Sequence, residues 1–95
     1  MNYWSWTGRP VGYREGNYLY NWNHDAVGQF KGQDVCGPDG KYLGEVRSRL
    51  LTRNPCRAEW RWKAFTAPPC GQQHERPALR ADRAMLPGFE DFPDR

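Results

Sequence analysis

Residues 18–28 read Tyr-Leu-Tyr-Asn-Trp-Asn-His-Asp-Ala-Val-Gly, and this stretch decides the fold. It contains an aromatic and aliphatic run, a polar stretch typical of a turn, and then an aliphatic residue followed by Gly28. The same aliphatic–glycine step ends at Gly12 and at Gly44, so the three glycines lie 16 residues apart. Repetition at a fixed spacing indicates that one small structural unit is copied along the chain.

Several other positions repeat at the same spacing. Nine positions before each glycine stands a large apolar residue, in the series Tyr3, Leu19 and Val35, and then Leu51. The next position holds Trp4, Tyr20, Cys36 and Thr52. The fourth copy, from about Leu50, is degenerate, because Trp60 takes the place of the glycine and Pro55-Cys56 replaces the turn. The spacing predicts four tandem 16-residue β-hairpin repeats over residues 1–64.

Each repeat carries turn-forming residues at its middle, namely Thr7-Gly8, Asn23-His24 and Asp39-Gly40. Tight two-residue hairpin turns need positive φ, which Gly, Asn and Asp adopt most readily. We therefore expect a two-residue turn at each pair. The resulting register places Tyr3 opposite Gly12, Leu19 opposite Gly28 and Val35 opposite Gly44. Each large side chain then covers the bare backbone of a glycine.

The same register leaves apolar residues on both faces of the hairpins. It pairs Leu51 with Trp60 in the fourth copy. On the other face it pairs Trp4 with Val11, Tyr20 with Val27 and Cys36 with Leu43. A single open sheet would leave one apolar face in water, and isolated hairpins are marginally stable. We expect an all-β fold whose hairpins curl around a pseudo-fourfold axis, or a homodimer that buries the second face.

The unit at residues 18–28 resembles those of small bacterial proteins called four-fold beta-flower proteins. The likeness covers residues 3–46 well and residues 47–63 poorly. The resemblance implies a cyclic all-β fold. Because that family has no established activity, the resemblance implies no function.

Length and composition agree with one small domain. The chain has 95 residues, of which 15% are aromatic, and aromatic side chains suit a pleated, half-buried surface. No apolar stretch is long enough for a signal peptide or a membrane span. The three cysteines lack the spacing of a disulfide framework. We expect a cytoplasmic protein without membrane association.

Residues 65–95 have a different composition and are expected to form an irregular tail. Their prolines are Pro68, Pro69, Pro77, Pro87 and Pro93, and such a composition is typical of a loop or of disorder. Residues 78–85 could form a short helix that begins after Pro77 and stops at Pro87-Gly88. Leu86, Phe89 and Phe92 are the candidates for docking onto an aromatic face, in the same or another copy of the chain.

The basic charge is concentrated in residues 47–63. This segment has a net charge of +5, whereas the whole chain has +3. It contains Arg47, Arg49, Arg53, Arg57, Arg61 and Lys63, together with Trp60 and Trp62. Cationic grooves lined with stacking rings hold single-stranded nucleic acids. In a strand, however, Arg61 and Lys63 would point away from the two rings, so a core strand with a basic outer face is the competing interpretation.

Metal binding and catalysis have weaker support. Cys36, Cys56, Cys70 and His74 could together ligate zinc, but no Cys-x-x-Cys pair exists. Cys70 and His74 are the one nucleophile–base pair close in sequence, and they lie in the proline-rich tail. No convergent set of titratable groups accompanies them. We expect no metal, no cofactor and no enzymatic activity.

The leading functional hypothesis is a non-enzymatic interaction module that binds a protein partner. Its candidate contact residues are Trp60, Trp62, Arg53, Arg57 and Arg61, with Leu86, Phe89 and Phe92 of the tail. Exposed aromatic clusters commonly anchor such contacts. The alternative is a small nucleic-acid-binding protein that uses residues 47–63. The positions of Trp60 and Trp62 discriminate between the two. Buried rings favour the first hypothesis, and rings exposed beside Arg47, Arg53 or Arg61 favour the second.

Overall fold

Short strands dominate the regular structure of the protein. The computed structural model describes residues 1–48, 50–69, 76–80 and 84–93. The strands are β1 (Asn2–Ser5), β2 (Pro10–Glu15), β3 (Tyr18–Tyr20), β4 (Ala26–Lys31), β5 (Asp34–Cys36), β6 (Tyr42–Arg47), β7 (Leu50–Arg53) and β8 (Glu90–Asp91), and one 3₁₀ turn, η1, spans Pro55–Arg57. The all-β fold expected from the repeats is confirmed.

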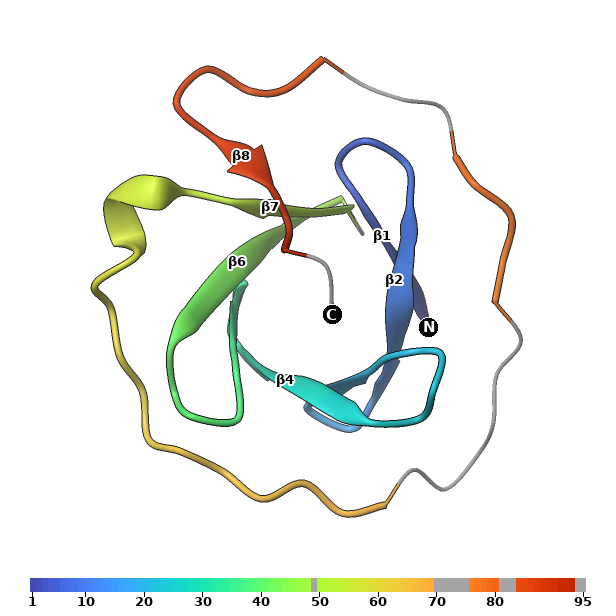
Figure 1. Ribbon diagram of the computed structural model, residues 1–95, viewed down its shortest axis with the longest axis vertical. Helices are drawn as coiled ribbons and strands as arrows, with labels where there is room; N and C mark the ends of the chain where they lie inside the picture. The colour runs from blue at the N-terminus through green and yellow to red at the C-terminus, as the bar shows by residue number, and fades with distance from the viewer. Residues whose placement is uncertain (49, 70–75, 81–83, 94–95) are drawn as a thin grey trace.

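The strands form one sheet that closes on itself. Each strand from β1 to β7 pairs antiparallel with the next one. β1 then pairs in parallel with β7, through Trp4 with Leu50 and Ser5 with Leu51, which closes a seven-stranded barrel. Figure 1 shows the ring viewed down the shortest axis of the molecule. The cyclic arrangement is therefore confirmed.

The register of the first three hairpins agrees in part with expectation. Tyr3 lies opposite Gly12, Leu19 opposite Gly28 and Val35 opposite Gly44, as predicted. The next predicted pairs are wrong by one residue. In the structure Trp4 faces Pro10, Tyr20 faces Ala26 and Cys36 faces Tyr42, because the register shifts once in each hairpin. Such bulges increase strand twist and bend, and they are frequent at the rims of barrels.

The shift follows from the loops, which have three residues and not the two expected. In the first hairpin the Ser5 N–H donates to the Arg9 carbonyl (2.7 Å) and the Gly8 N–H donates to the Ser5 carbonyl (3.0 Å). Only the second residue of each predicted turn pair has positive φ, namely Gly8, His24 and Gly40. A turn followed by one left-handed residue is the usual three-residue hairpin loop, and it produces a bulge.

The glycine column exists because the next hairpin approaches closely. A Cβ on Gly12 would overlap the main-chain oxygen of Tyr20, and a Cβ on Gly44 would overlap that of Thr52. A Cβ on Gly28 would lie 2.8 Å from a methyl carbon of Val35. The glycines are thus required by contact between neighbouring hairpins and not by the cross-strand cover that the sequence suggested.

The barrel interior is a single apolar core. It contains Tyr3, Val11, Leu19, Phe30, Val35, Leu43, Leu51 and Phe92. Each strand from β1 to β7 supplies at least one of these residues, and Phe92 comes from the end of the chain. Burial of each such side chain stabilises the fold by roughly 1.5–3 kcal/mol.

The fourth hairpin is completed from the far end of the chain. β8 pairs antiparallel with β7, on the edge that β1 also uses. Thr52 faces Asp91. The equivalent pairs in the other hairpins are Trp4 with Pro10, Tyr20 with Ala26, and Cys36 with Tyr42. Phe92 follows Asp91 and so corresponds to the aliphatic residues Val11, Val27 and Leu43. It occupies their place in the core, and residues 54–89 run between the two strands of this hairpin.

The expected pairing of Leu51 with Trp60 is therefore wrong. The chain turns away at the end of β7, where the Asn54 side chain accepts a hydrogen bond from the Cys56 N–H (3.0 Å) and begins η1. Trp60 lies outside the barrel and is 49% exposed. A cap and a proline at the start of η1 thus divert the chain before it can return along β7.

The described residues after η1, namely 58–69, 76–80 and 84–89, lie around the outside of the barrel, and we call them the belt (Figure 1). Aromatic side chains of the hairpins donate hydrogen bonds to carbonyls of the belt. Tyr20 Oη donates to Pro68 O (2.6 Å), Trp4 Nε1 to Ala78 O (2.9 Å) and Trp6 Nε1 to Ala84 O (2.8 Å). In return, the Trp62 and Arg80 N–H groups donate to the carbonyls of Gly40 (2.7 Å) and Gly8 (2.9 Å). Residues at repeating positions of the hairpins therefore hold the belt.

The helix expected at residues 78–85 does not occur at the described positions 78–80 and 84–85; residues 81–83 lie outside the described residues. The carbonyls of Ala78 and Ala84 accept from tryptophan side chains, so they bond to the barrel. Within the described residues, no helix has the length and apolar character needed to cross a membrane.

Candidate functional site

An aromatic surface forms where the belt leaves η1. We call Tyr42, Arg57, Trp60 and Trp62 the arginine–aromatic face. Main-chain bonds place it: the Trp60 N–H donates to the Arg57 carbonyl (3.0 Å) and the Tyr42 N–H to the Trp60 carbonyl (3.3 Å). An isolated bridge between Lys41 and Arg61 continues this contact. The face is therefore fixed by hydrogen bonds between the belt and the start of β6.

The rings of this face pack on one another and on a guanidinium group. The Arg57 guanidinium carbon lies 3.7 Å from the centroid of the Trp60 ring and 5.3 Å from that of Tyr42. The Trp62 ring lies 6.2 Å from Trp60 and 6.3 Å from Tyr42. Contacts of a cation over an aromatic face contribute about 0.5–2 kcal/mol each. The stack gives Trp60 a rigid support on its inner side.

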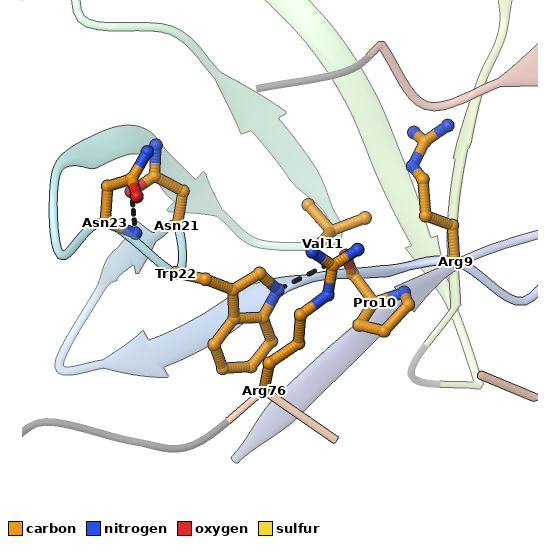
Figure 2. A pocket seen from close by; sticks show the side chains of 7 residues that line it. All are labelled: Arg9, Pro10, Val11, Asn21, Trp22, Asn23 and Arg76. Atoms are coloured by element: carbon orange, nitrogen blue, oxygen red, sulfur yellow. Dashed lines mark hydrogen bonds between the residues drawn. The ribbon is translucent and has the colours of Figure 1, made fainter. Parts of the chain in front are cut away.

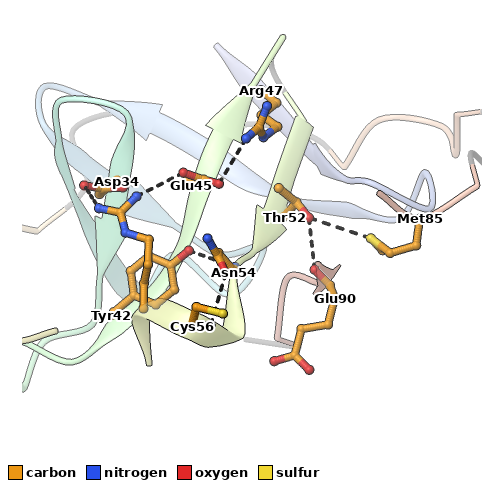
Figure 3. A network of polar contacts seen from close by, with 10 residues as sticks. Asp34, Tyr42, Glu45, Arg47, Thr52, Asn54, Cys56, Met85 and Glu90 are labelled. Atoms are coloured by element: carbon orange, nitrogen blue, oxygen red, sulfur yellow. Dashed lines mark hydrogen bonds and ion pairs between the residues drawn. The ribbon is translucent and has the colours of Figure 1, made fainter. Parts of the chain in front are cut away.

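Two carboxylates, which Figure 3 labels as Asp34 and Glu45, hold Arg57 in place. Its Nη2 lies 2.7 Å from an oxygen of Asp34, and its Nη1 lies 3.1 Å from an oxygen of Glu45. Asp34 and Glu45 face each other across β5 and β6, where two like charges would repel. Arg57 removes that repulsion. Neither carboxylate was predicted from the sequence as part of a site, although two acidic residues paired in the predicted register are a signal that a cation lies between them.

Tyr42 joins the face to the end of β7. Its hydroxyl oxygen accepts a hydrogen bond from the Asn54 N–H at 2.9 Å (Figure 3). Burial raises the pKa of Tyr42 above its ordinary value, even though the Asn54 contact acts in the opposite direction. The side chain is therefore neutral near pH 7 and serves as a buried support for the exposed rings.

A pocket of about 400 Å³ separates the arginine–aromatic face from β8. Its lining includes Tyr42, Ala58, Arg53, Glu90 and Asp91. Arg53 and Glu90, which are paired on β7 and β8, form an ion pair in the wall of this pocket. The pocket thus combines an aromatic wall with charges of both signs, a composition that suits a polar or aromatic side chain of a partner.

A second pocket, of about 160 Å³, lies between the first two hairpins. Figure 2 shows Trp22 and Arg76 side by side, with Arg9 separate from them. Trp22 Nε1 donates to the Pro10 carbonyl (3.2 Å), and Arg9 Nη2 donates to the Phe92 carbonyl (3.1 Å). These bonds join the two hairpins and fix the Phe92 carbonyl. The residues around this pocket therefore have a structural role.

Comparison with known proteins adds a family to this fold. The model of the family described as 4-fold beta flower protein matches residues 2–89. The chain belongs to this family. No curated protein and no solved structure matches the chain.

Three arginines in the basic segment of this beta-flower chain have acidic neighbours. Arg53 pairs with Glu90, and Arg57 pairs with Asp34 and Glu45 as described above. Arg47 approaches Glu45 at 3.5 Å, whereas Arg49 lies outside the described residues. Arg61 is exposed, and its side chain donates to the carbonyls of Ala58 and Trp60 (both 3.0 Å). The +5 charge of residues 47–63 is thus partly compensated within the fold.

The candidate residues of the tail are divided between core and surface. Phe92 is buried inside the barrel of the beta flower. Leu86 and Phe89 are half-buried, and the Arg47 guanidinium lies 4.8 Å from the centroid of the Phe89 ring. The tail therefore docks onto its own chain, which was one of the two arrangements that its apolar residues suggested.

The cysteines of the beta flower do not form a shared site where the structure describes them. Cys36 is buried in β5, and burial raises the pKa of its thiol. Cys56 lies exposed in η1. Cys70 and His74 lie outside the described residues, and among those described no three His, Cys, Asp or Glu side chains gather as for a metal ion. Cys36 is best explained as a packing residue.

Replacement of Arg57 by methionine should lower the free energy of unfolding by about 2–3 kcal/mol, because Asp34 and Glu45 lose their common partner. Denaturation in urea, followed by circular dichroism, measures this change. Arg61→Met is the control, since the Arg61 side chain is exposed and its loss should change stability by about 0.5 kcal/mol or less. Equal effects of the two substitutions would contradict the role given to Arg57.

Proposed function

We propose that this chain is a non-enzymatic interaction module that binds a protein partner through the arginine–aromatic face. The observation that carries the proposal is the position of Trp60, a large ring that is half exposed and yet backed by a guanidinium group at 3.7 Å. Tryptophan, tyrosine and arginine are the residues most enriched where binding energy concentrates in interfaces.

Preorganisation of the face supports this proposal. Arg57 is anchored by Asp34 and Glu45, and Tyr42 by Asn54. Side chains that are already fixed lose little conformational entropy when a partner binds, and that entropy is a main cost of association. The neighbouring pocket, lined by Arg53 and Glu90, offers polar contacts at the rim of such an interface.

We restrict the proposed interface to this face because of how the tail packs on its own chain. Phe92, one of the apolar residues that the sequence offered for a partner, is buried in the barrel of its own chain. We place the protein in the cytoplasm as part of the same proposal. Cys36 and Cys56 have the form of free thiols, which a reducing compartment maintains.

The test compares Trp60→Ala with Leu79→Ala. Leu79 is 73% exposed, so it is a large apolar side chain elsewhere on the belt. Partners captured from cell extract by the wild-type chain and by Leu79→Ala, but not by Trp60→Ala, are the expected result. With the purified partner, calorimetry should show a loss of about 2 kcal/mol or more for Trp60→Ala. Partners retained equally by both variants would contradict the proposal.

Binding of nucleic acid is the alternative function, and the same variants test it. The Trp60 ring is 49% exposed and lies next to Arg57 and Arg61, an arrangement that, by the criterion drawn from the sequence, favours nucleic acid. Arg47, Arg53 and Arg57 nevertheless have acidic neighbours, so we expect no saturable binding of a labelled single-stranded oligonucleotide at low salt. Fluorescence anisotropy measures this directly. Binding that falls steeply with salt, as release of counterions requires, and that weakens in Trp60→Ala or in Arg61→Ala would assign the face to nucleic acid instead.

A further inference from the structure

β8 is held in the way a bound peptide strand is held. It has two residues, and its first, Glu90, pairs with Arg53. Its second, Asp91, accepts hydrogen bonds from the Trp6 N–H (3.0 Å) and from the Thr7 hydroxyl. Phe92 then enters the core, where it is 2% exposed. The segment therefore presents two acidic side chains and one aromatic anchor to the edge of β7.

Main-chain groups of the segment are also recognised. The Thr52 hydroxyl donates to the Glu90 carbonyl (3.0 Å), and Arg9 Nη2 donates to the Phe92 carbonyl (3.1 Å). Strand addition to a sheet edge combines such main-chain bonds, which give affinity, with side-chain pockets, which give specificity. We call the edge of β7, with Arg53, Thr52, the Trp6 N–H and the space filled by Phe92, the β7 socket.

The connection into the socket is a four-residue turn whose two central residues, Pro87 and Gly88, are exposed. The Phe89 N–H donates to the Leu86 carbonyl (3.0 Å), and Gly88 has a φ of 78° with no atom near its free side. Opening of this four-residue turn would carry β8 roughly 13 Å away, at the length of an extended chain. A hinge of this kind is what exchange of a terminal element between copies requires.

We propose that the β7 socket is a strand-binding site that accepts residues 90–92 of a second copy of this chain. A second copy is the occupant that the structure favours, because the matching acidic–acidic–aromatic strand is present on the chain itself. The contacts in an exchanged dimer equal those in the closed monomer. Closure within one chain is favoured by an effective concentration on the order of millimolar, so the dimer forms at high protein concentration. This site shares Arg53 and Glu90 with the pocket beside the arginine–aromatic face, but it uses none of the rings of that face, so the proposal does not depend on the proposed function.

A labelled peptide of residues 86–95 tests the socket in the full-length chain. Phe92→Ala removes the resident anchor, so we expect this variant to bind the peptide saturably and to gain thermal stability as peptide is added. The wild-type chain, whose socket is filled, should bind at least tenfold more weakly. A peptide that carries the same Phe92→Ala change should bind about 30-fold more weakly or worse, as for a lost aromatic anchor. Leu79→Ala should behave like the wild type.

Rescue keeps the test valid if Phe92→Ala unfolds, because peptide binding should then restore the folded signal in circular dichroism. A second variant, Glu90→Ala with Asp91→Ala, loosens the resident strand without a core cavity and should bind the peptide more tightly than the wild type. Failure of both variants to bind or to be rescued would overturn the socket. Light scattering of the wild-type chain at millimolar concentration should show a dimer that Phe92→Ala lacks. Peptide binding without that dimer would overturn the second copy as the occupant.

Discussion

Replacement of Phe92 by alanine is expected to lower the free energy of unfolding by about 3–5 kcal/mol, the usual cost of truncating a buried phenylalanine. The ring is 2% exposed and belongs to the core cluster that every barrel strand joins. It also stands where the fourth hairpin needs its core residue. Because a small domain has only about 5–15 kcal/mol of total stability, this loss is large. Urea denaturation followed by circular dichroism gives the value.

Leu79→Ala is the matched control for this substitution. It also truncates a large apolar side chain of residues 65–95, but Leu79 is 73% exposed, so the expected change is within about 0.5 kcal/mol. A Phe92→Ala variant as stable as Leu79→Ala would show that the end of the chain adds nothing to the barrel.

Gly12→Ala should also be strongly destabilising, with a loss of about 3 kcal/mol or more in the free energy of unfolding. The added methyl group would overlap the main-chain oxygen of Tyr20. A backbone atom held in a sheet cannot move aside cheaply, so the first two hairpins must separate. Thermal denaturation compares the variant with the wild-type chain.

Gly16→Ala is the control, since it adds the same methyl group at a turn with open space. Gly16 has a φ of 63°, and a Cβ there would meet no atom within 4 Å. Its expected cost is about 1 kcal/mol, from the left-handed backbone conformation alone. If Gly16→Ala were the more damaging of the two, the close approach of the hairpins at Gly12 would be contradicted.

The sequence predicts the hairpins because their determinants are local and repeated. The spacing of Gly12, Gly28 and Gly44 predicts the register opposite Tyr3, Leu19 and Val35, and this register is found. Loop length was less predictable. A residue pair such as Thr7-Gly8 suits a two-residue turn and also the end of a three-residue loop with Gly8 in the left-handed region.

β8 could not be predicted from local sequence. Glu90-Asp91 is a charged pair with little strand propensity, and its partner strand β7 lies far back in the chain. The fourth repeat nevertheless indicated that such a strand was needed, because it lacks one core residue. Residues 50–64 supply no equivalent of Val11, Val27 and Leu43, so a closed core required an apolar residue from elsewhere, and Phe92 provides it.

The sequence predicted several residues of the candidate site but not how they are arranged. Trp60, Trp62 and Arg57 were recognised as candidates, but the alternation of a strand would have separated the rings from the charges. η1 changes that relation, because the turn after Asn54 brings the Arg57 guanidinium against the Trp60 ring. Tyr42 was missed, although a large ring at the position of Pro10 and Ala26 in the repeat is itself a departure from the pattern.

The central claim is that the end of the chain completes the fourth hairpin, and proton NMR tests it most directly. Phe92 lies against Gly44, where an added Cβ would be 2.6 Å from a ring carbon. The account predicts nuclear Overhauser contacts from the Phe92 ring to the Gly44 α-protons and to Leu51, with the glycine protons shifted away from their random-coil positions by the ring. Phe92 ring protons at random-coil shifts, without contacts to Gly44 or Leu51, would contradict it.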